Sequence, residues 1–438
     1  MTDLTPVPKS PSEADQVADV AGRNFTVERG ELVIGGLPVS QIADEFGTPL
    51  YVYDQAVLER QLAALQAVLP ASFALFYSVK ANPNSAILKF FVEHGCGLEI
   101  ASSGELVQAL GAGCKAERIL FAGPGKTLAE LTLAIEHGIG EIHLESLAEA
   151  RRIAAIARQA NRTVRVAVRV NPSAGIQGGG MRMGAKPSPF GVDEDQLDAV
   201  LEELKQEPAL DVTGIHLFVG TQILDAEILL GQYREALAIG RRVSATLGRP
   251  LRTIDLGGGL GVPYFAHEHR LDLKAVGEGL DRLAREAAAD PALCEAKFVI
   301  EPGRFLVGEC GVYVTRVLDV KRSRGKTFVI VDGGMHQHLA ASGNLGQTIK
   351  RNFPVAVLNK FDAPPADAVD VVGPLCTPLD VLARNLPLPA VVEGDLVGVL
   401  QSGAYARTAS PLGFLSHPAP PEILVSAGRA QLVRSRGE

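Results

Sequence analysis

The stretch Phe73–Pro83, with the sequence FALFYSVKANP, decides the fold that we expect. Its apolar, aromatic-rich run up to Val79 is typical of a strand buried on both faces. The strand is expected to end at Lys80, because Asn82-Pro83 breaks it. A partly desolvated lysine has a lowered pKa and can attack an aldehyde to form a Schiff base. A lysine that extends its amine into solvent is the common alternative.

The composition indicates a large protein made of two domains. The 438 residues are too many for one compact core, and the formal charge of −8 offers no basic surface for nucleic acid. The five cysteines are scattered without a Cys-x-x-Cys pair, which predicts no disulfide framework, no metal site and a reducing, cytoplasmic compartment. No apolar run is long enough to span a membrane. Residues 1–22 lack a signal-peptide pattern and are expected to form a disordered arm.

From about residue 74 onward, short apolar runs alternate with helical patterns, as in repeated βα units around a parallel sheet. Such a series predicts a closed (β/α)₈ barrel over residues 48–300, with an open doubly wound sheet as the alternative. The expected strands are 74–79, 97–100, 118–121, 141–144, 164–170, 212–219, 253–256 and 298–300.

Two further segments flank the predicted barrel. Residues 301–438 contain strands separated by loops rich in Gly and Pro, which predicts an antiparallel β-domain. Residues 23–47 include a hairpin pattern at Phe25–Ile34, and we expect these strands to join the β-domain.

The ends of the barrel strands are where catalytic groups are expected. Gly257-Gly258-Gly259 follows the seventh strand, where backbone N–H groups can bind a phosphate, and Arg304 can add a charged contact. Glu301 can face a pyridine nitrogen and keep it protonated, with a Glu301–Arg304 salt bridge as the alternative.

An aromatic ring completes this set of side chains. His216 and Phe218 are two residues apart on a predicted strand and so share a face, where one ring can stack on a cofactor. Core packing of Phe218 is the alternative. A Schiff-base lysine, a phosphate-binding loop, a carboxylate for a ring nitrogen and a stacking ring together indicate pyridoxal 5'-phosphate (PLP).

With these motifs the chain resembles the fold-type III PLP decarboxylases, which include diaminopimelate, ornithine and arginine decarboxylases. The resemblance runs from about Thr48 to about Pro411. It implies a PLP-binding barrel plus a β-domain, as in alanine racemase and ornithine decarboxylase, and a head-to-tail homodimer. The motifs that carry it are Tyr77–Asn82, Glu99–Glu105, Asp255–Gly259, Glu301–Arg304, Gly373–Cys376 and Gly403–Tyr405.

The resemblance also implies roles for individual residues. Lys80 would hold PLP covalently, and Cys376 would come from the partner subunit and return a proton to the substrate after CO₂ leaves. A thiol near an electropositive cofactor can do this at neutral pH, whereas a buried structural cysteine is the alternative. The implied cofactor-binding set is Lys80, Glu99, Arg169, His216, Phe218, Thr221, Gly257, Gly258, Gly259, Glu301, Arg304 and Tyr405.

The chain departs from the usual family pattern at three places. Phe218 stands where a stacking histidine is usual, so the ring can stack but cannot carry charge. Enzymes whose substrates have a distal amine carry an acidic residue at the position of Thr377. With threonine at this position, Asp380 is the nearby candidate for a contact with the substrate. The Arg-Pro-Ala-Leu-Tyr segment of diaminopimelate decarboxylases is missing after Met335.

These departures resemble the branch that decarboxylates amino acids tethered to carrier proteins, as does Met181-Arg182-Met183-Gly184. The branch includes the butirosin-type glutamyl-carrier decarboxylase and exosortase-associated decarboxylases. The predicted substrate is therefore glutamate held as a thioester on an acyl carrier protein, with free diaminopimelate as the alternative. A non-catalytic regulator is disfavoured because Lys80 and Cys376 are both present. An amino-acid racemase is disfavoured by the Gly-Pro-Leu-Cys segment.

Overall fold

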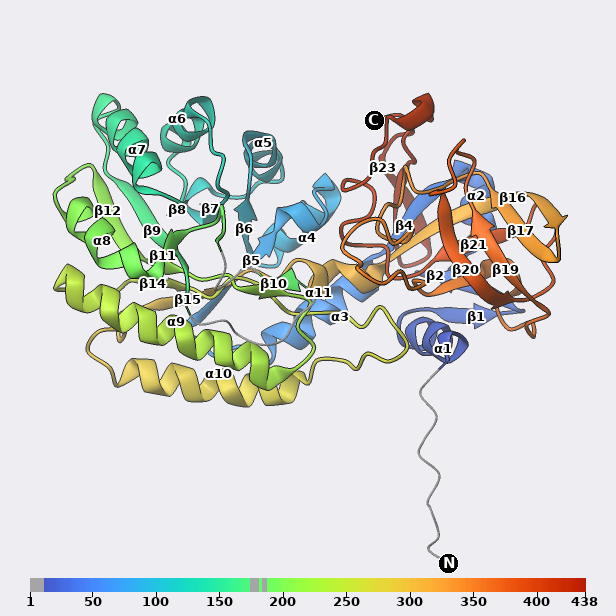
Figure 1. The fold of residues 1–438 in the computed structure, drawn as a ribbon, viewed down its shortest axis with the longest axis horizontal. Helices are drawn as coiled ribbons and strands as arrows, with labels where there is room; N and C mark the ends of the chain where they lie inside the picture. Colours follow the sequence, from blue (N-terminus) through green and yellow to red (C-terminus); the bar gives the residue numbers. More distant parts are fainter. Residues whose placement is uncertain (1–11, 174–180, 183–186) are drawn as a thin grey trace, which may run out of the picture. The chain divides into compact units, whose positions relative to one another are not determined.

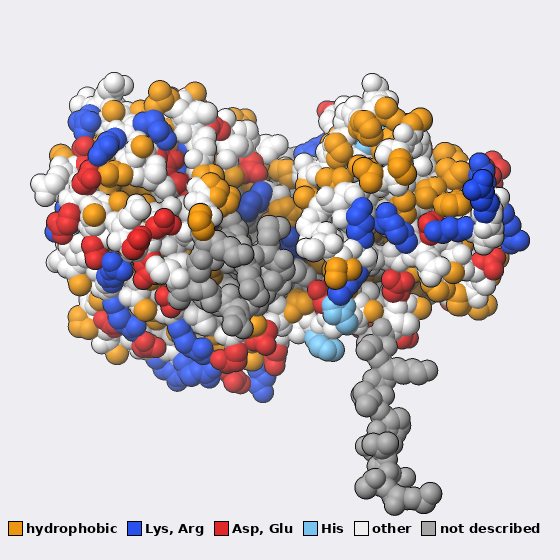
Figure 2. All heavy atoms as spheres, viewed as in Figure 1, with side chains coloured by type: hydrophobic (Ala, Val, Ile, Leu, Met, Phe, Trp, Pro, Cys, Tyr) orange, Lys and Arg blue, Asp and Glu red, His pale blue; other side chains and the backbone are white. Residues whose placement is uncertain are grey.

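The computed structural model describes residues 12–173, 181–182 and 187–438, and these fall into two compact units. The first unit comprises Met1–Arg60, Pro263–Arg270 and Val307–Glu438, and the second comprises Gln61–Val262 and Leu271–Leu306. No helix in the described part of the chain is long and apolar enough to cross a membrane. Figure 2 shows acidic and basic side chains interspersed on the face that it draws.

The second unit contains the predicted barrel. Among the described residues, eight parallel strands close into a ring, because the last strand pairs with the first and the fourth pairs with the fifth. The prediction of a closed barrel is confirmed. In the order of the ring the strands are β5 (Phe73–Ser78), β6 (Gly97–Ile100), β7 (Ile119–Phe121), β8 (Glu141–Leu144), β9 (Val164–Asn171), β12 (Leu210–His216), β14 (Thr253–Asp255) and β15 (Lys297–Ile300).

Helices cover the outside of these strands (Figure 1). Most of them begin at a side chain that caps the first turn, such as Ser102, Thr127 and Asp225. The helices are α3 (Gln55–Gln66), α4 (Ser85–Glu93), α5 (Ser103–Gly111), α6 (Leu128–His137), α7 (Leu147–Gln159), α8 (Leu197–Lys205), α9 (Ala226–Leu247) and α10 (Leu273–Ala288). Helix α10 lies beside α9, and Gly279 makes room there for Leu230.

The strand β5 shows how the barrel positions polar groups. Its two-residue period places Ala74, Phe76 and Ser78 on one face. Ala74 and Phe76 join Leu120 and Val299 in a buried hydrophobic cluster. Ser78 comes last in the strand and makes a hydrogen bond to a buried carboxylate of the neighbouring strand. The same strand therefore contributes to the core and begins the polar end of the barrel.

The first unit is rich in strands, as predicted, but its main sheet is mixed rather than antiparallel. The pairs β17–β19 and β4–β22 are parallel. Strand β4 lies in this sheet between β16 and β22, although we expected residues from 48 onward to belong to the barrel. The strands are β4 (Leu50–Asp54), β16 (Gly311–Ser323), β17 (Lys326–Val331), β18 (Val355–Val357), β19 (Asp367–Val372), β20 (Val381–Leu388), β21 (Leu396–Val399), β22 (Glu422–Ser426) and β23 (Arg429–Arg434).

The N-terminal segment differs from the expectation of a disordered arm. Residues 13–22 lie in helix α1 (Glu13–Asn24), which begins with a capping box between Ser12 and Asp15. Its Val20 is buried, and its Arg23 contacts Glu309 at 2.7 Å. The expectation rested on the composition of residues 1–22, which does not reveal contacts with residues far away in the sequence. The strands β1 (Thr26–Glu28), β2 (Glu31–Ile34) and β3 (Leu37–Pro38) form a separate small sheet in the same unit, followed by α2 (Val39–Phe46).

Candidate active site

Lys80 lies at the carboxyl end of β5 but outside the strand. The strand ends at Ser78, and Lys80 occupies the short 3₁₀ turn η1 (Val79–Ala81). Its Nζ lies 2.6 Å from Oε2 of Glu99, on the neighbouring strand β6, and Ser78 Oγ donates to the same oxygen at 2.5 Å. The Lys80 side chain is 44% exposed, whereas that of Glu99 is 1% exposed. A buried carboxylate thus holds an accessible amine at the end of the barrel.

A cluster of buried titratable side chains lies inside the barrel, on β8, β12, β14 and the residue after β15. His216 Nε2 is 3.5 Å from Glu301 Oε2, and His143 Nε2 is 3.6 Å from Asp255 Oδ2. The two imidazole rings lie 4.3 Å apart. The parallel barrel brings these four side chains together although they are far apart in the sequence.

The protonation of this cluster follows from its burial. Burial, assisted by His143, lowers the pKa of His216 to about 4, so the His216 imidazole is neutral at pH 7. Burial and the neighbouring Glu301 raise the pKa of Asp255 well above its usual value, so Asp255 carries the proton of this carboxyl pair. Burial also acts to raise the pKa of Glu301, but His216, His143 and Lys80 together lower it below its usual value, so Glu301 is ionised.

The Glu301 carboxylate retains an unused acceptor. Its Oε1 is buried and has no hydrogen-bond partner among the described residues. A buried carboxylate oxygen that lacks a hydrogen-bond partner is suited to accept a hydrogen bond from a protonated pyridine nitrogen. This observation fits the ring of PLP.

The glycine loop follows β14 and packs against the residue after β15. Gly257 has a φ of +64°, its N–H donates to Asp255 Oδ1 at 2.8 Å, and its carbonyl accepts from the Glu301 N–H at 2.8 Å. A Cβ on Gly258 would lie 2.5 Å from the Glu301 carbonyl oxygen. Only glycine leaves the backbone this close, which is the property that a phosphate loop needs. Arg304 begins the short helix α11 (Arg304–Val307), three residues after Glu301.

Two other predicted residues are placed as follows. Arg169, on β9, donates to Glu145 Oε1 at 2.8 Å and lies over the Phe190 ring at 4.8 Å. Phe218 is not on one strand with His216, because β12 ends at His216. Its ring instead contacts the glycine loop, where a Cβ on Gly257 would lie 2.8 Å from Phe218 Cδ2. The expectation that the two residues share a strand face is wrong.

Thr221 and the first two residues of the Met181–Gly184 motif lie in a small two-stranded sheet of the barrel unit. Thr221 belongs to β13 (Gly220–Thr221), which pairs with β10 (Met181–Arg182). Met183 and Gly184 lie outside the described residues.

The remaining predicted residues lie in the first unit. Cys376 is exposed and carries a free thiol. Thr377 is half-buried, and its Oγ1 accepts from the Leu379 N–H at 3.3 Å. Tyr405 is half-buried with a φ of +52°.

Asp380, in contrast, is buried and fully engaged. Its two carboxylate oxygens accept from the backbone N–H groups of Met335, at 2.6 Å, and Leu375, at 2.9 Å. It therefore braces the segments around Met335 and Cys376 against each other, which favours a structural role over a substrate contact.

His143, Glu145 and Asp255 were not among the predicted site residues. The sequence offered a signal for the first two. The fourth predicted strand is followed by Glu145, and the two-residue period of a strand puts Glu141, His143 and Glu145 on one face.

The same cluster has the composition of a metal site. His143, His216 and Glu301 each offer a ligand atom within 4.8 Å of the others. Glu301 is also the carboxylate that a pyridine nitrogen would need, so a metal ion and the cofactor ring would compete for it.

Comparison with known proteins decides between these possibilities. Residues 55–308 match the family described as "Pyridoxal-dependent decarboxylase, pyridoxal binding domain". The chain belongs to this family of pyridoxal-dependent decarboxylases. It is accordingly a PLP-dependent amino-acid decarboxylase, and the predicted cofactor is confirmed.

Members of the family are similar to this decarboxylase over nearly the whole chain. It is 39% identical, over 91% of its length and 94% of the relative, to the L-glutamyl-[BtrI acyl-carrier protein] decarboxylase of Niallia circulans. It is 32% identical to the diaminopimelate decarboxylase of Zymomonas mobilis, over 94% and 96% of the two chains. The solved structure of diaminopimelate decarboxylase from Helicobacter pylori complexed with L-lysine matches with a TM-score of 0.79 at 28% identity, over 91% and 97% of the two chains.

Proposed function

We propose that this decarboxylase acts on L-glutamate linked as a thioester to an acyl carrier protein, and releases a carrier-bound 4-aminobutyryl group. The observation that carries the proposal is Thr377. A threonine cannot neutralise a buried ammonium group, so the site suits a substrate that has no cation at its distal end. The thioester end of carrier-bound glutamate is uncharged. The similarity to a decarboxylase named for a glutamyl carrier protein supports the same substrate.

PLP, when bound, withdraws electrons from the α-carbon of the amino acid and so permits loss of its carboxylate as CO₂. Lys80 supplies the amine that holds the cofactor covalently, and Glu99 orients this amine through the contact at 2.6 Å. Glu301, kept ionised within the buried cluster, holds a proton on the ring nitrogen. The backbone of Gly257, Gly258 and Gly259 binds the phosphate, and Phe218 packs against this loop.

The proton that replaces CO₂ is assigned to Cys376. Its thiol is exposed in the single chain, and so is accessible to a second copy. We propose a homodimer in which Cys376 of one subunit serves the Lys80 site of the other. Proton donation from a thiol to the α-carbon then yields the amine product and a thiolate, which solvent reprotonates.

Free diaminopimelate is the second candidate substrate. The similarity to diaminopimelate decarboxylases favours it. However, the Arg-Pro-Ala-Leu-Tyr segment is replaced after Met335 by His336-Gln337-His338, and Asp380 is occupied by backbone N–H groups. These two segments therefore do not provide the charged side chains that would bind the distal end of diaminopimelate.

Mass spectrometry tests the proposal. Carrier protein loaded with glutamate is incubated with the PLP-bound enzyme, and free diaminopimelate, ornithine, lysine and glutamate are incubated in parallel. Loss of one CO₂ from the tethered glutamate alone is the expected result. Turnover of free diaminopimelate without reaction of the carrier would show that our interpretation of Thr377 is wrong.

A further inference from the structure

A buried carboxylate, Glu145, directly follows β8 and takes no part in the proposed chemistry. Its side chain is only 3% exposed. Its Oε1 accepts from Arg169 Nη1 at 2.8 Å and from the Gly123 N–H at 2.9 Å, and its Oε2 accepts from the Gly191 N–H at 2.7 Å. Burial acts to raise the pKa of Glu145, but Arg169 and Lys126 lower it below its usual value, so the carboxylate is ionised.

The position of Glu145 is itself fixed by a second buried ion pair. The Glu145 N–H donates to Glu149 Oε2 at 2.8 Å, and Glu149 Oε1 accepts from Lys126 Nζ at 3.0 Å. Lys126 Nζ also donates to the carbonyl oxygens of Gly123 and His143, each at 2.8 Å. These three contacts use all three N–H donors of the ammonium group. Lys126 and Glu149 therefore form a frame that holds Glu145 in place.

The strand register places Arg169 on the inner face of the barrel. Arg169 is paired with His216 in the parallel strands β9 and β12, and Ala167 is paired with His143 in β9 and β8. Side chains at paired positions of neighbouring parallel strands lie on the same face of a sheet. The His143 and His216 rings meet at 4.3 Å inside the barrel, so Arg169 also faces inward.

The positive charge of Arg169 acts on the buried cluster beside Glu301. Burial is the main cause of the lowered pKa of His216, and the charges of His143 and Arg169 lower it further, although Glu301 opposes them. A guanidinium group has five N–H donors, so the contact of Arg169 Nη1 with Glu145 is compatible with a second contact to an anion. Arg169 is thus a cation directed into the end of the barrel where the cofactor is expected.

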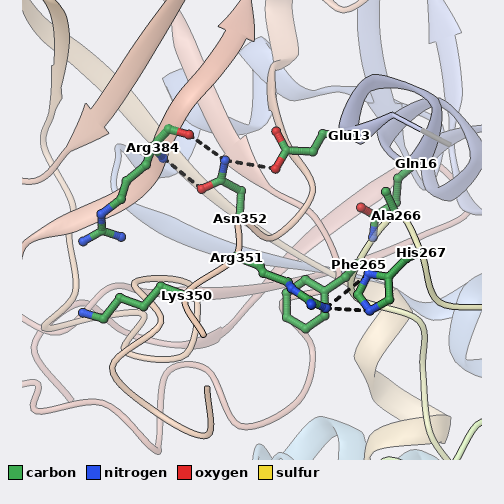
Figure 3. Close-up of a pocket in the computed structure, with 9 residues that line it drawn as sticks. All are labelled: Glu13, Gln16, Phe265, Ala266, His267, Lys350, Arg351, Asn352 and Arg384. Atoms are coloured by element: carbon green, nitrogen blue, oxygen red, sulfur yellow. Dashed lines mark hydrogen bonds between the residues drawn. The ribbon is translucent and has the colours of Figure 1, made fainter. Parts of the chain in front are cut away.

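The cations around a pocket in the first unit are arranged differently. This pocket has a volume of about 340 Å³. Figure 3 shows Lys350 and Arg384 extending to one side of it, Gln16 and Arg351 on the other side, and Asn352 between them. These side chains do not converge on one point. Arg169 differs from them because a buried carboxylate fixes the direction of its guanidinium group.

We propose that Glu145 is a positioning residue of the cofactor site, which holds Arg169 so that its guanidinium group pairs with an anionic oxygen of PLP. Charge-assisted hydrogen bonds from arginine to such oxygens are strong. A long side chain loses rotamer freedom when it forms such a bond, and this loss opposes binding unless the side chain is already held in place. Glu145 orders Arg169 before PLP binds. The inference concerns the cofactor and does not depend on which amino acid is decarboxylated.

A double-mutant cycle tests this inference, with the dissociation constant for PLP measured by titrating the apoenzyme with the cofactor. The variants are Glu145→Gln, Arg169→Gln and the two combined. Each single variant should bind PLP roughly tenfold more weakly, because each loses the same charge-assisted contact. The combined variant should also be about tenfold weaker, since the two residues act through one contact. Weakening of about a hundredfold in the combined variant would show independent effects and overturn the proposal. Unchanged PLP affinity in either folded single variant would overturn it as well.

Glu422→Gln is the matched control for a purely structural role. Glu422 is a buried carboxylate of the first unit that pairs with Arg434 at 3.0 Å. Its substitution should lower the free energy of unfolding and leave PLP affinity unchanged. If it weakened PLP binding as much as Glu145→Gln does, the effect would reflect a general loss of stability, and the proposal would be wrong.

Glu145→Asp covers the case in which Glu145→Gln does not fold. The loss of the Glu145 charge leaves a buried arginine unpaired, which is strongly destabilising. Aspartate keeps the charge, but its carboxylate is one methylene group closer to the backbone and cannot hold Arg169 in the same position. This variant should fold and still bind PLP more weakly than the wild type. Wild-type PLP affinity in Glu145→Asp would then overturn the proposal.

Discussion

Glu99 is the residue that fixes the position of Lys80. Its Oε2 accepts from both Ser78 and Lys80, and its side chain is almost fully buried on β6. The sequence predicted Lys80 and Glu99 from their motifs. It could not predict that a turn separates Lys80 from β5, since strand ends depend on which backbone groups find partners in the neighbouring strand.

Replacing Lys80 with alanine should remove the covalent link to PLP. The expected result is loss of the absorbance of the covalently bound cofactor and loss of CO₂ release, measured on the purified variant. Lys89→Ala is the control, because Lys89 is exposed and pairs with Glu93 on the same helix. An unchanged absorption spectrum in the Lys80 variant would show that another amine holds the cofactor.

His338 gives the fold a pH dependence. It is buried, its Nδ1 accepts from the Ala341 N–H at 3.2 Å, and its Nε2 lies 2.9 Å from Ser402 Oγ. Burial lowers its pKa from 6.5 to about 3. Between about pH 3 and pH 6.5, His338 is therefore protonated in the unfolded chain but neutral in the folded chain. The His338 contribution to the free energy of unfolding should decrease by about 1.4 kcal/mol per pH unit as the pH falls below 6.5.

Denaturant unfolding at several pH values measures this effect against a variant. His338→Gln lacks the titrating group but can offer an acceptor to the Ala341 N–H. The difference in unfolding free energy between wild type and variant should be constant above pH 6.5. As the pH falls below 6.5, the wild type should lose stability relative to the variant. Parallel curves down to pH 4 would contradict the neutral state of His338.

At the scale of elements, the barrel strands were predictable and the sheet of the other unit was less so. Each barrel strand is a short apolar run followed by a helix, which is a local pattern. Strand β4 is equally apolar, but it pairs with β16 and β22, which follow it by hundreds of residues. Likewise, α1 is stabilised by contacts such as that of Arg23 with Glu309. Pairings over such distances leave no local signal.

The glycine loop after β14 is an element that one methyl group should disrupt. Gly258→Ala places a Cβ about 2.5 Å from the Glu301 carbonyl oxygen, so the backbone must move. We expect a loss of about 1–3 kcal/mol in unfolding free energy and weaker PLP binding, measured by denaturant titration and by cofactor titration. Gly231→Ala is the control, since Gly231 lies in α9 with open space around it, and it should stabilise by about 0.5–1 kcal/mol. Equal PLP affinity in both variants would contradict the role of the loop.

At the scale of the whole molecule, the proposed dimer divides one active site between two chains. The sequence pointed to this arrangement only through the resemblance that assigns Cys376 to the partner. An equal mixture of Lys80→Ala and Cys376→Ala subunits, allowed to exchange, should recover about a quarter of wild-type activity, since half of the dimers are mixed and each mixed dimer has one intact site.

Each variant alone, taken through the same exchange, serves as the control and should be inactive. If Cys376 instead served Lys80 of its own chain, no mixed dimer would contain an intact site. Absence of recovery in a mixture shown to exchange subunits would therefore contradict the shared site.

The substrate is the central claim, and a competition experiment tests it most directly. Glutamyl-loaded carrier protein and free diaminopimelate are supplied together to the PLP-bound enzyme, and both products are followed in time by mass spectrometry. With the two substrates at equal concentrations, the ratio of the initial rates gives the ratio of kcat/KM values, whatever the enzyme concentration. We predict CO₂ loss from the carrier-bound glutamate with diaminopimelate left intact. Preferential decarboxylation of diaminopimelate would contradict the account.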